Sequence, residues 1–268
     1  AASGVRVASF TGHEAGIAAA AFSPDSQRLV TASRDHTARV WDVYRPMTRR
    51  GVFEQPSPVS RIAVSGNGER IAIVTQGCVL ALYEGRTLRP APAHWCFSHF
   101  GAASAALSSD GALLAAPLDG FTVFVLDTST GEVLSAYTGH RGRVYATAFS
   151  PGSDSVLTAG RDGTAHLWET RTARTLAVLK GHTRPLRCAA FSPDGALLAT
   201  GGDDCTVRLW DAQTGAELHV LNKHTGSVNA VAFDPGGTRL LSASSDGSVL
   251  CWDPANGETL SQFLGHAD

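Results

Sequence analysis

Histidine, serine and aspartate recur together along the chain, and serine hydrolases use these three residue types as base, nucleophile and orienting acid. The first and the last of these sets are His13, Ser33 and Asp35, and His224, Ser244 and Asp246. An active site is needed once, whereas related sets occur four times at constant spacing. The repetition therefore indicates a structural role, and we expect a non-enzymatic protein with no catalytic residue, metal or cofactor.

Each set also has a tryptophan 28 residues after its histidine. The sets are His13, Ser33, Asp35 and Trp41; His140, Asp162 and Trp168; His182, Asp204 and Trp210; and His224, Ser244, Asp246 and Trp252. In the second and third sets, Gly160 and Gly202 stand where the serine would be. Thr158 and Thr200 lie two residues earlier on the same strand face, and the sequence leaves open whether they replace the missing hydroxyl.

The elements that must position these residues are clearest in residues 181–211, GHTRPLRCAAFSPDGALLATGGDDCTVRLWD. Runs with strand character cover 186–192, 197–201 and 206–210, a fourth follows at 217–221, and turn residues stop each run. Pro193-Asp194-Gly195 supplies the first turn, because proline presets φ and glycine accepts the positive φ of a tight reversal. The pattern predicts a four-stranded antiparallel meander.

This unit repeats with a fixed period. Trp168, Trp210 and Trp252 lie 42 residues apart, and so do the matching histidines. A period in the forties with Gly-His and Trp-Asp marks is typical of propeller blades, and the whole chain resembles the WD40 repeat family. The resemblance implies an all-β propeller in which tryptophan, serine or threonine, histidine and aspartate form a hydrogen-bonded tetrad inside each four-stranded blade.

We predict one propeller domain, 1–268, with six full blades and an additional outer strand at 5–10. The approximate repeats are 12–53, 54–97, 98–138, 139–180, 181–222 and 223–264. In the second repeat Gln55 and Tyr83 replace histidine and tryptophan, and in the third Leu126 replaces tryptophan, so these blades are expected to be less well braced. Six blades could close a ring, but we favour a piece of a longer, seven-bladed or multi-propeller array.

Binding residues must be those that differ between blades. The resemblance implies that peptides bind the narrow channel face, at positions three and five residues after the histidine and just before the tetrad aspartate. The candidates are Arg143, Tyr145, Arg161, Arg187, Asp203 and Arg34. Arginine and tyrosine are enriched in binding hot spots, so we expect an acidic or phosphorylated partner segment. Ordinary solvated arginines remain the alternative.

Composition excludes little else. The chain has 268 residues, 43% of them hydrophobic, and a formal net charge of -2, which favours neither nucleic acid nor an anionic membrane. The five cysteines include no C-x-x-C pair, which argues against a disulfide framework or a zinc site. No apolar run approaches the ~18 residues of a membrane span. We expect a cytoplasmic, reducing location.

The balanced charge argues against nucleic-acid binding through the same arginines, and three other functions remain open. The first is a non-catalytic protein-interaction scaffold, expected to belong to a larger chain or complex. The second is a regulatory or sensor module of a larger ATPase, kinase or cytoskeleton-associated protein. The third is a propeller enzyme with a metal or polar cluster, for which His94 and His99, near Trp95 and Cys96, are the nearest candidates; a surface position is the expected reading.

Overall fold

A computed structural model describes residues 9–23, 25–44, 49–77, 79–96, 104–118 and 120–264. Within these ranges every regular element is a β-strand, so no helix there could cross a membrane. The strands form six sheets of four strands each, called blades one to six here in chain order. The chain divides into two compact units, 1–134 and 135–268, and the single-domain assignment with its repeat boundaries stays a prediction.

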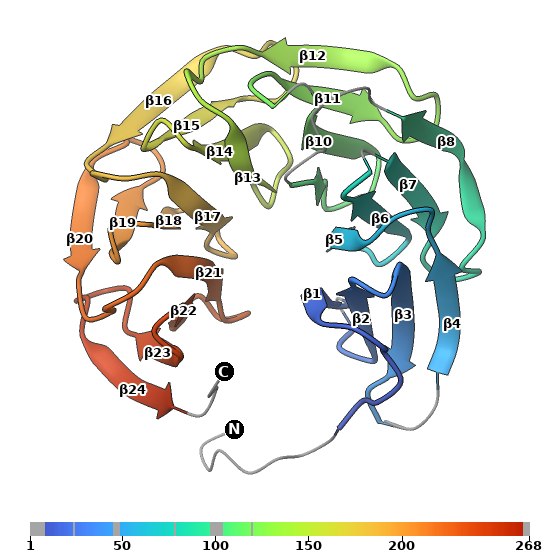
Figure 1. Ribbon diagram of the computed structural model, residues 1–268. Coiled ribbons are helices and arrows are strands. Elements are labelled where there is room, and N and C mark those ends of the chain that lie inside the picture. Colours follow the sequence, from blue (N-terminus) through green and yellow to red (C-terminus); the bar gives the residue numbers. More distant parts are fainter. Residues whose placement is uncertain are drawn as a thin grey trace. The chain divides into compact units, whose positions relative to one another are not determined.

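Unit 1 holds blades one and two and most of blade three (Figure 1). Strand orders are β1-β2-β3-β4, β5-β6-β7-β8 and β12-β11-β10-β9. The strands are β1 (Ile17–Phe22), β2 (Arg28–Ser33), β3 (Thr37–Asp42), β4 (Arg49–Glu54), β5 (Val59–Val64), β6 (Arg70–Thr75), β7 (Val79–Glu84), β8 (Pro90–Cys96), β9 (Ala106–Leu107), β10 (Leu113–Pro117), β11 (Val123–Asp127) and β12 (Val133–Tyr137).

Unit 2 holds blades four to six, in which every strand pairs with the next one along the chain. The strands are β13 (Val144–Phe149), β14 (Ser155–Gly160), β15 (Thr164–Glu169), β16 (Thr175–Lys180), β17 (Leu186–Phe191), β18 (Leu197–Gly202), β19 (Val207–Asp211), β20 (Glu217–Leu221), β21 (Val228–Phe233), β22 (Leu240–Ser244), β23 (Ser248–Trp252) and β24 (Thr259–Leu264).

The all-β, four-stranded antiparallel prediction is confirmed, and blade five shows why it succeeds. Its four strands lie where the alternating apolar runs predict them. In the turn after β17, Gly195 has φ 74° and donates its backbone N–H to the Ser192 carbonyl. Asp194 accepts a hydrogen bond from the Ser192 hydroxyl at 2.5 Å. The turn residues therefore fix the register of β17 against β18.

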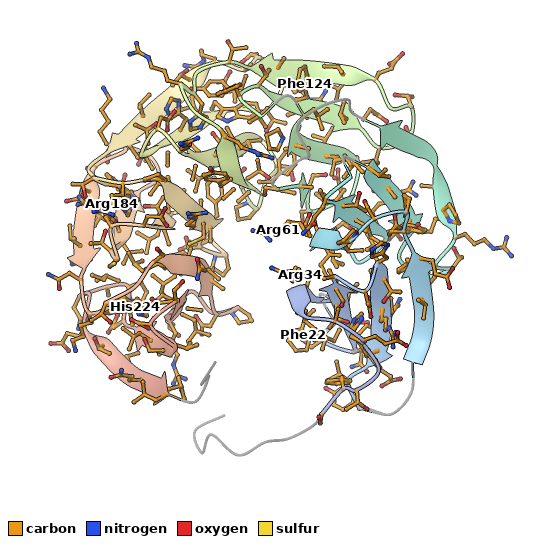
Figure 2. All side chains as sticks on the ribbon, viewed as in Figure 1. Phe22, Arg34, Arg61, Phe124, Arg184 and His224 are labelled. Atoms are coloured by element: carbon orange, nitrogen blue, oxygen red, sulfur yellow. The ribbon has the colours of Figure 1, made fainter. Side chains whose placement is uncertain are left out.

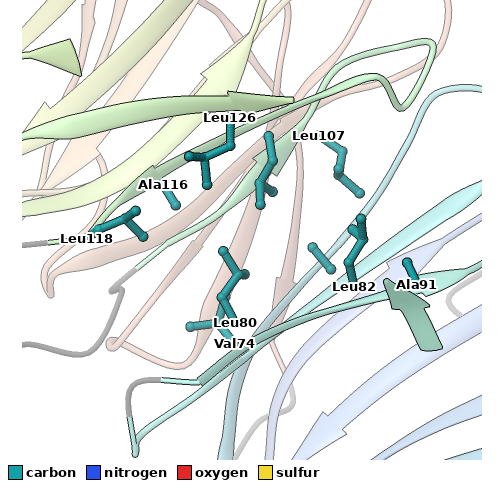
Figure 3. Packing of buried hydrophobic residues seen from close by; sticks show 10 residues of the cluster. Val74, Leu80, Leu82, Ala91, Leu107, Ala116, Leu118 and Leu126 are labelled. Carbon is teal, nitrogen blue, oxygen red and sulfur yellow. The ribbon is translucent and has the colours of Figure 1, made fainter. Parts of the chain in front are cut away.

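The cores lie between neighbouring blades of the same unit. In unit 1, Val74, Leu80 and Leu82 of blade two pack with Ala116 and Leu126 of blade three (Figure 3). In unit 2 a corresponding cluster joins residues of blades four and five. The second strands, such as β14 and β18, are almost continuously buried because each is covered on both faces. This explains why they read as unbroken small and apolar runs.

Candidate functional site

The tetrad of blade five is a continuous series of hydrogen bonds that runs from the tryptophan to the aspartate. Trp210 Nε1 donates to Thr200 Oγ1 at 2.9 Å. His182 Nε2 lies 2.8 Å from the same hydroxyl, and His182 Nδ1 lies 2.8 Å from Asp204 Oδ2. Because the carboxylate only accepts, Nδ1 carries the ring proton and the Thr200 hydroxyl donates to Nε2. Every polar side-chain atom of this tetrad thus has a partner within its own blade.

Blades one, four and six repeat this geometry with one correction to the sequence analysis. The hydroxyl that joins tryptophan to histidine comes from Thr31 and Ser242, not from Ser33 and Ser244. Thr158 supplies it in blade four, as Thr200 does in blade five. The open question about the two glycine-containing sets is therefore answered, since the hydroxyl stands 10 residues before each tryptophan in all four blades.

The correction follows from the strand register. In blade one Thr31 pairs with Arg39 and therefore lies diagonally across from Trp41, within reach of the indole N–H. Ser33 lies at the end of β2, where its hydroxyl donates to the Ala15 carbonyl at 3.0 Å and accepts from the Asp35 backbone N–H at 3.1 Å. Ser33 closes the loop around the tetrad without belonging to it. Ser244 has the same role in blade six.

Blade two replaces the tetrad by a shorter link that sequence reasoning missed. Gln55 Nε2 donates to the Tyr83 hydroxyl at 2.8 Å, and both residues are buried. The Tyr83 ring also packs on Phe53, with centroids 4.3 Å apart. Gln55 and Tyr83 are the residues that stand in place of histidine and tryptophan. The blade therefore keeps one polar brace between the same two positions.

The tetrad of blade four is extended by two further buried residues, His166 of β15 and Tyr137, the last residue of β12 in blade three. The His166 ring lies 4.0 Å from the His140 ring, and Tyr137 stacks on Trp168 at 4.8 Å. His166 Nε2 lies 2.9 Å from the Thr164 hydroxyl, and His166 Nδ1 lies 2.7 Å from Tyr137 Oη. Since Thr164 donates to Asp162, His166 is protonated at Nε2 and accepts at Nδ1. His140, Asp162 and His166 form the only group in the described part of the chain whose side chains could together approach a metal ion.

The charged states differ within this cluster. Burial raises the pKa of Asp162, but hydrogen bonds from His140 and Thr164 outweigh it, and the net pKa is lowered. Burial lowers the pKa of His166 to about 4, helped by repulsion from the neighbouring His140. At neutral pH the cluster therefore holds a carboxylate beside a neutral His166. Similar hydrogen bonds lower the pKa of Asp35 and Asp246, against the opposing effect of burial.

The low pKa of His166 predicts a loss of stability in mild acid. The unfolded chain takes up a proton near pH 6.5, whereas folded His166 does so near pH 4. Its contribution is complete above pH 6.5 and is lost as the pH falls toward 4, with a slope of up to about 1.4 kcal/mol per pH unit. The free energy of unfolding, measured by denaturant unfolding at several pH values in this range, should change less steeply with pH for His166→Gln than for the wild type. Identical slopes would contradict the burial of a neutral imidazole.

The candidate binding residues Tyr145 and Arg187 stand at β-bulges. The pairing of β13 with β14 shifts between Val144 and Ala146, and that of β17 with β18 shifts between Leu186 and Cys188. The residue between each pair is the extra one, which leaves the ladder and is aimed differently from its neighbours. Bulges thus place both side chains at the same end of their blades, beside the turns that carry Arg161 and Asp203.

Arg187 is the centre of this group. Its Nε and Nη2 donate to the two carboxylate oxygens of Asp203, each at 2.8 Å. Its guanidinium carbon also lies 5.3 Å from the centre of the Tyr145 ring, within range of a cation–π contact. Hydrogen bonding by Arg187 lowers the pKa of Asp203, although partial burial opposes it. Arg187 therefore joins blade four to blade five.

Further arginines surround this contact. The Arg161 backbone N–H donates to the Arg143 carbonyl at 2.7 Å. Gly163, in the same turn as Arg161, lies against the backbone of Arg184. The Arg184 side chain, on the loop into β17, is labelled in Figure 2 and acts electrostatically on Asp203. Sequence reasoning missed Arg184, although it directly precedes Pro185, a position that the family resemblance does mark.

We call Arg143, Tyr145, Arg161, Arg184, Arg187 and Asp203 the arginine surface. Within the described residues Arg161 and Arg184 are exposed and take part in no ion pair. The tetrad carboxylates nearby, Asp162 and Asp204, are turned inward, with side chains 14% and 5% exposed. The exposed charge of this surface is therefore positive.

The other predicted residues belong to other parts of the chain. Arg34 belongs to unit 1, where it is exposed on the turn after β2 and donates its backbone N–H to the Gly16 carbonyl at 3.0 Å. Its part in binding stays a prediction. The predicted strand at 5–10 falls mostly outside the described residues, and the side chains of His94 and His99 lie outside them altogether.

Comparison with known proteins supports the repeat assignment. The family model described as "WD domain, G-beta repeat" matches residues 4–42, 131–169, 173–211 and 215–253, which together are more than half of the chain. Each match contains one of the four complete tetrads.

Individual relatives align over about three fifths of the chain. A serine-threonine kinase receptor-associated protein from Gallus gallus is 30% identical over 159 residues, 59% of this chain and 44% of the relative. A protein LST8 homolog from Dictyostelium discoideum is 30% identical over 165 residues, 60% of this chain and 54% of the relative. Periodic tryptophan protein 2 from Arabidopsis thaliana is 27% identical over 163 residues, 18% of its length. The chain thus spans about half the length, or less, of these relatives.

Proposed function

Because the chain belongs to the WD40 repeat family, we propose that it is a non-catalytic scaffold that binds segments of partner proteins on the arginine surface. The histidines and aspartates that resemble hydrolase residues are used up in hydrogen bonds inside single blades. Five of the six predicted binding residues, all but Arg34, lie at one end of blades four and five. One observation carries the proposal: Arg187 contacts both Tyr145 and Asp203, while Arg161 and Arg184 are exposed in the same group.

The proposed ligand is an acidic or phosphorylated segment. Guanidinium groups bind carboxylates and phosphates through paired hydrogen bonds, which are stronger than neutral ones. Asp203 forms its ion pair with Arg187, so an anion from a partner would meet the exposed Arg161 and Arg184. The Tyr145 ring, fixed under Arg187, offers a flat surface for an adjacent apolar or aromatic side chain.

Protein partners are also in line with the relatives. The name of the Gallus gallus relative describes association with a serine-threonine kinase receptor, and we propose association with a protein for this chain as well. A reducing, cytoplasmic location is part of the proposal. It is supported by Cys188, Cys205 and Cys251, which are free thiols, and burial raises the pKa of Cys188 to about 12, which keeps that thiol unreactive.

A peptide comparison tests the ligand class. Three fluorescent peptides would be titrated with the protein. They share the same acidic sequence and differ only at the central residue, which is phosphoserine, aspartate or asparagine. We expect the phosphoserine peptide to bind tightest and the asparagine peptide weakest, with affinity falling as salt is added, because the contact is between charges. Equal affinity for all three peptides, or no binding of any, would overturn the acidic-segment proposal.

A further inference from the structure

A second surface lies at the opposite end of blades four and five. Arg187 and Tyr145 stand near the starts of β17 and β13, whereas the turns 150–154 and 192–196 follow the ends of these strands. Between these turns lies a hollow of about 420 Å³. Pro151 of blade four approaches Gly195 of blade five there, so the hollow sits at the junction of the two blades within unit 2. A volume of this size accommodates a few side chains of a bound segment.

The floor of the hollow is apolar. Leu167, Leu176 and Phe191 line it, together with Ala212. Leu167 is buried and belongs to the core that joins blades four and five, whereas Leu176 is 43% exposed. An apolar floor that is continuous with the core and partly open to solvent is typical of a surface that receives an apolar side chain.

The rim is acidic. Asp154, Asp194 and Asp211 line the hollow, and no lysine, arginine or histidine is among its described lining residues. Within the described part of the chain none of the three carboxylates takes part in an ion pair with a basic side chain. Hydrogen bonds from Ser192 and from Thr214 lower the pKa of Asp194 and of Asp211. Three carboxylates that have no basic ion-pair partner among the described residues thus line the hollow around its apolar floor.

We infer that this hollow, which we call the acidic groove, binds a partner segment that carries an apolar side chain between lysines or arginines. The apolar side chain would rest on Leu167, Leu176 and Phe191, and the basic side chains would meet the three aspartates. The charge is opposite to that of the arginine surface at the other end of the same blades. Unit 2 would therefore hold two chemically different segments at once, one acidic and one basic. The inference does not rest on the proposed function, since it uses other residues.

The test uses a fluorescent peptide in which Leu-Phe is flanked on both sides by lysines. In a titration with the full chain we expect saturable binding that weakens with salt. Peptides with glutamate in place of lysine, or serine in place of Leu-Phe, should bind at least about tenfold more weakly, because charge or apolar burial is lost. Asp194→Asn with Asp211→Asn should weaken the lysine peptide about tenfold.

The control is Asp234→Asn with Asp253→Asn. These aspartates hold the equivalent turns of blade six, with hydrogen bonds to the backbone of Arg239 and Ala255, and they do not line the hollow. Asparagine keeps the accepting oxygen in each turn, so both double variants should fold, as checked by circular dichroism, and both remove the same charge. The inference is overturned if the lysine peptide does not bind, or if the two double variants weaken it equally.

Discussion

Arg161→Glu combined with Arg187→Glu is expected to weaken binding of the phosphoserine peptide by about 100-fold or more. Arg161→Glu removes a guanidinium that meets the anion, and each charge-assisted hydrogen bond to an anion contributes about 1.5–3 kcal/mol. The two reversed charges also repel the ligand. Arg187→Glu further removes the guanidinium that links Tyr145 to Asp203. Fluorescence anisotropy at low salt measures the loss, and thermal unfolding shows whether the variant remains folded.

The matched control is Arg171→Glu combined with Arg239→Glu. Both arginines are exposed in unit 2, and they lie at the other end of the strands, after β15 and before β22. The change in net charge is the same, so a general electrostatic effect would appear in both variants. Binding of the phosphoserine peptide that survives the reversal of Arg161 and Arg187 would place the site away from the arginine surface.

Ser242→Ala is expected to destabilise the protein by about 2–4 kcal/mol. The Ser242 hydroxyl accepts from Trp252 Nε1 at 2.8 Å and lies 2.7 Å from His224 Nε2. Removing it leaves two buried polar atoms without a partner, and each costs about 1–3 kcal/mol. Urea unfolding followed by tryptophan fluorescence gives the change in the free energy of unfolding.

Ser244→Ala is the matched comparison, because it makes the same chemical change two residues further along β22. Ser244 bonds the Gly226 carbonyl and the Asp246 backbone N–H near the surface, so water can replace part of its contribution. We expect a cost of about 1 kcal/mol. A larger loss of unfolding free energy for Ser244→Ala than for Ser242→Ala would indicate that Ser244, as the sequence suggested, supplies the tetrad hydroxyl.

Much of the fold is predictable because the same pattern of strands and turns occurs in several repeats of the sequence. The strands of blade five follow directly from alternating apolar residues and from the turn Pro193-Asp194-Gly195. The spacing of histidine, aspartate and tryptophan likewise locates three members of each tetrad. These features depend on local sequence and on a constant period, which a single chain reveals by comparison with itself.

The remaining features depend on three-dimensional register. Whether Thr31 or Ser33 reaches Trp41 is decided by the diagonal pairing of β2 with β3, since both side chains point to the same face. The bond between Gln55 and Tyr83 and the extension through Tyr137 and His166 join residues of unusual type across strands. The bulges that orient Tyr145 and Arg187 could not be predicted from the amino-acid composition of these strands. Such contacts appear only when the strands are paired.

The central claim is that the repeated side chains hold the blades together while the irregular ones recognise partners. Its most direct test measures the free energy of unfolding and the affinity for the phosphoserine peptide in two variants, His182→Ala and the Arg161→Glu, Arg187→Glu pair. We predict that His182→Ala loses about 1–3 kcal/mol of stability yet binds normally at a temperature where it is folded, while the arginine pair keeps most of its stability and loses binding. Lost binding in fully folded His182→Ala would contradict the claim.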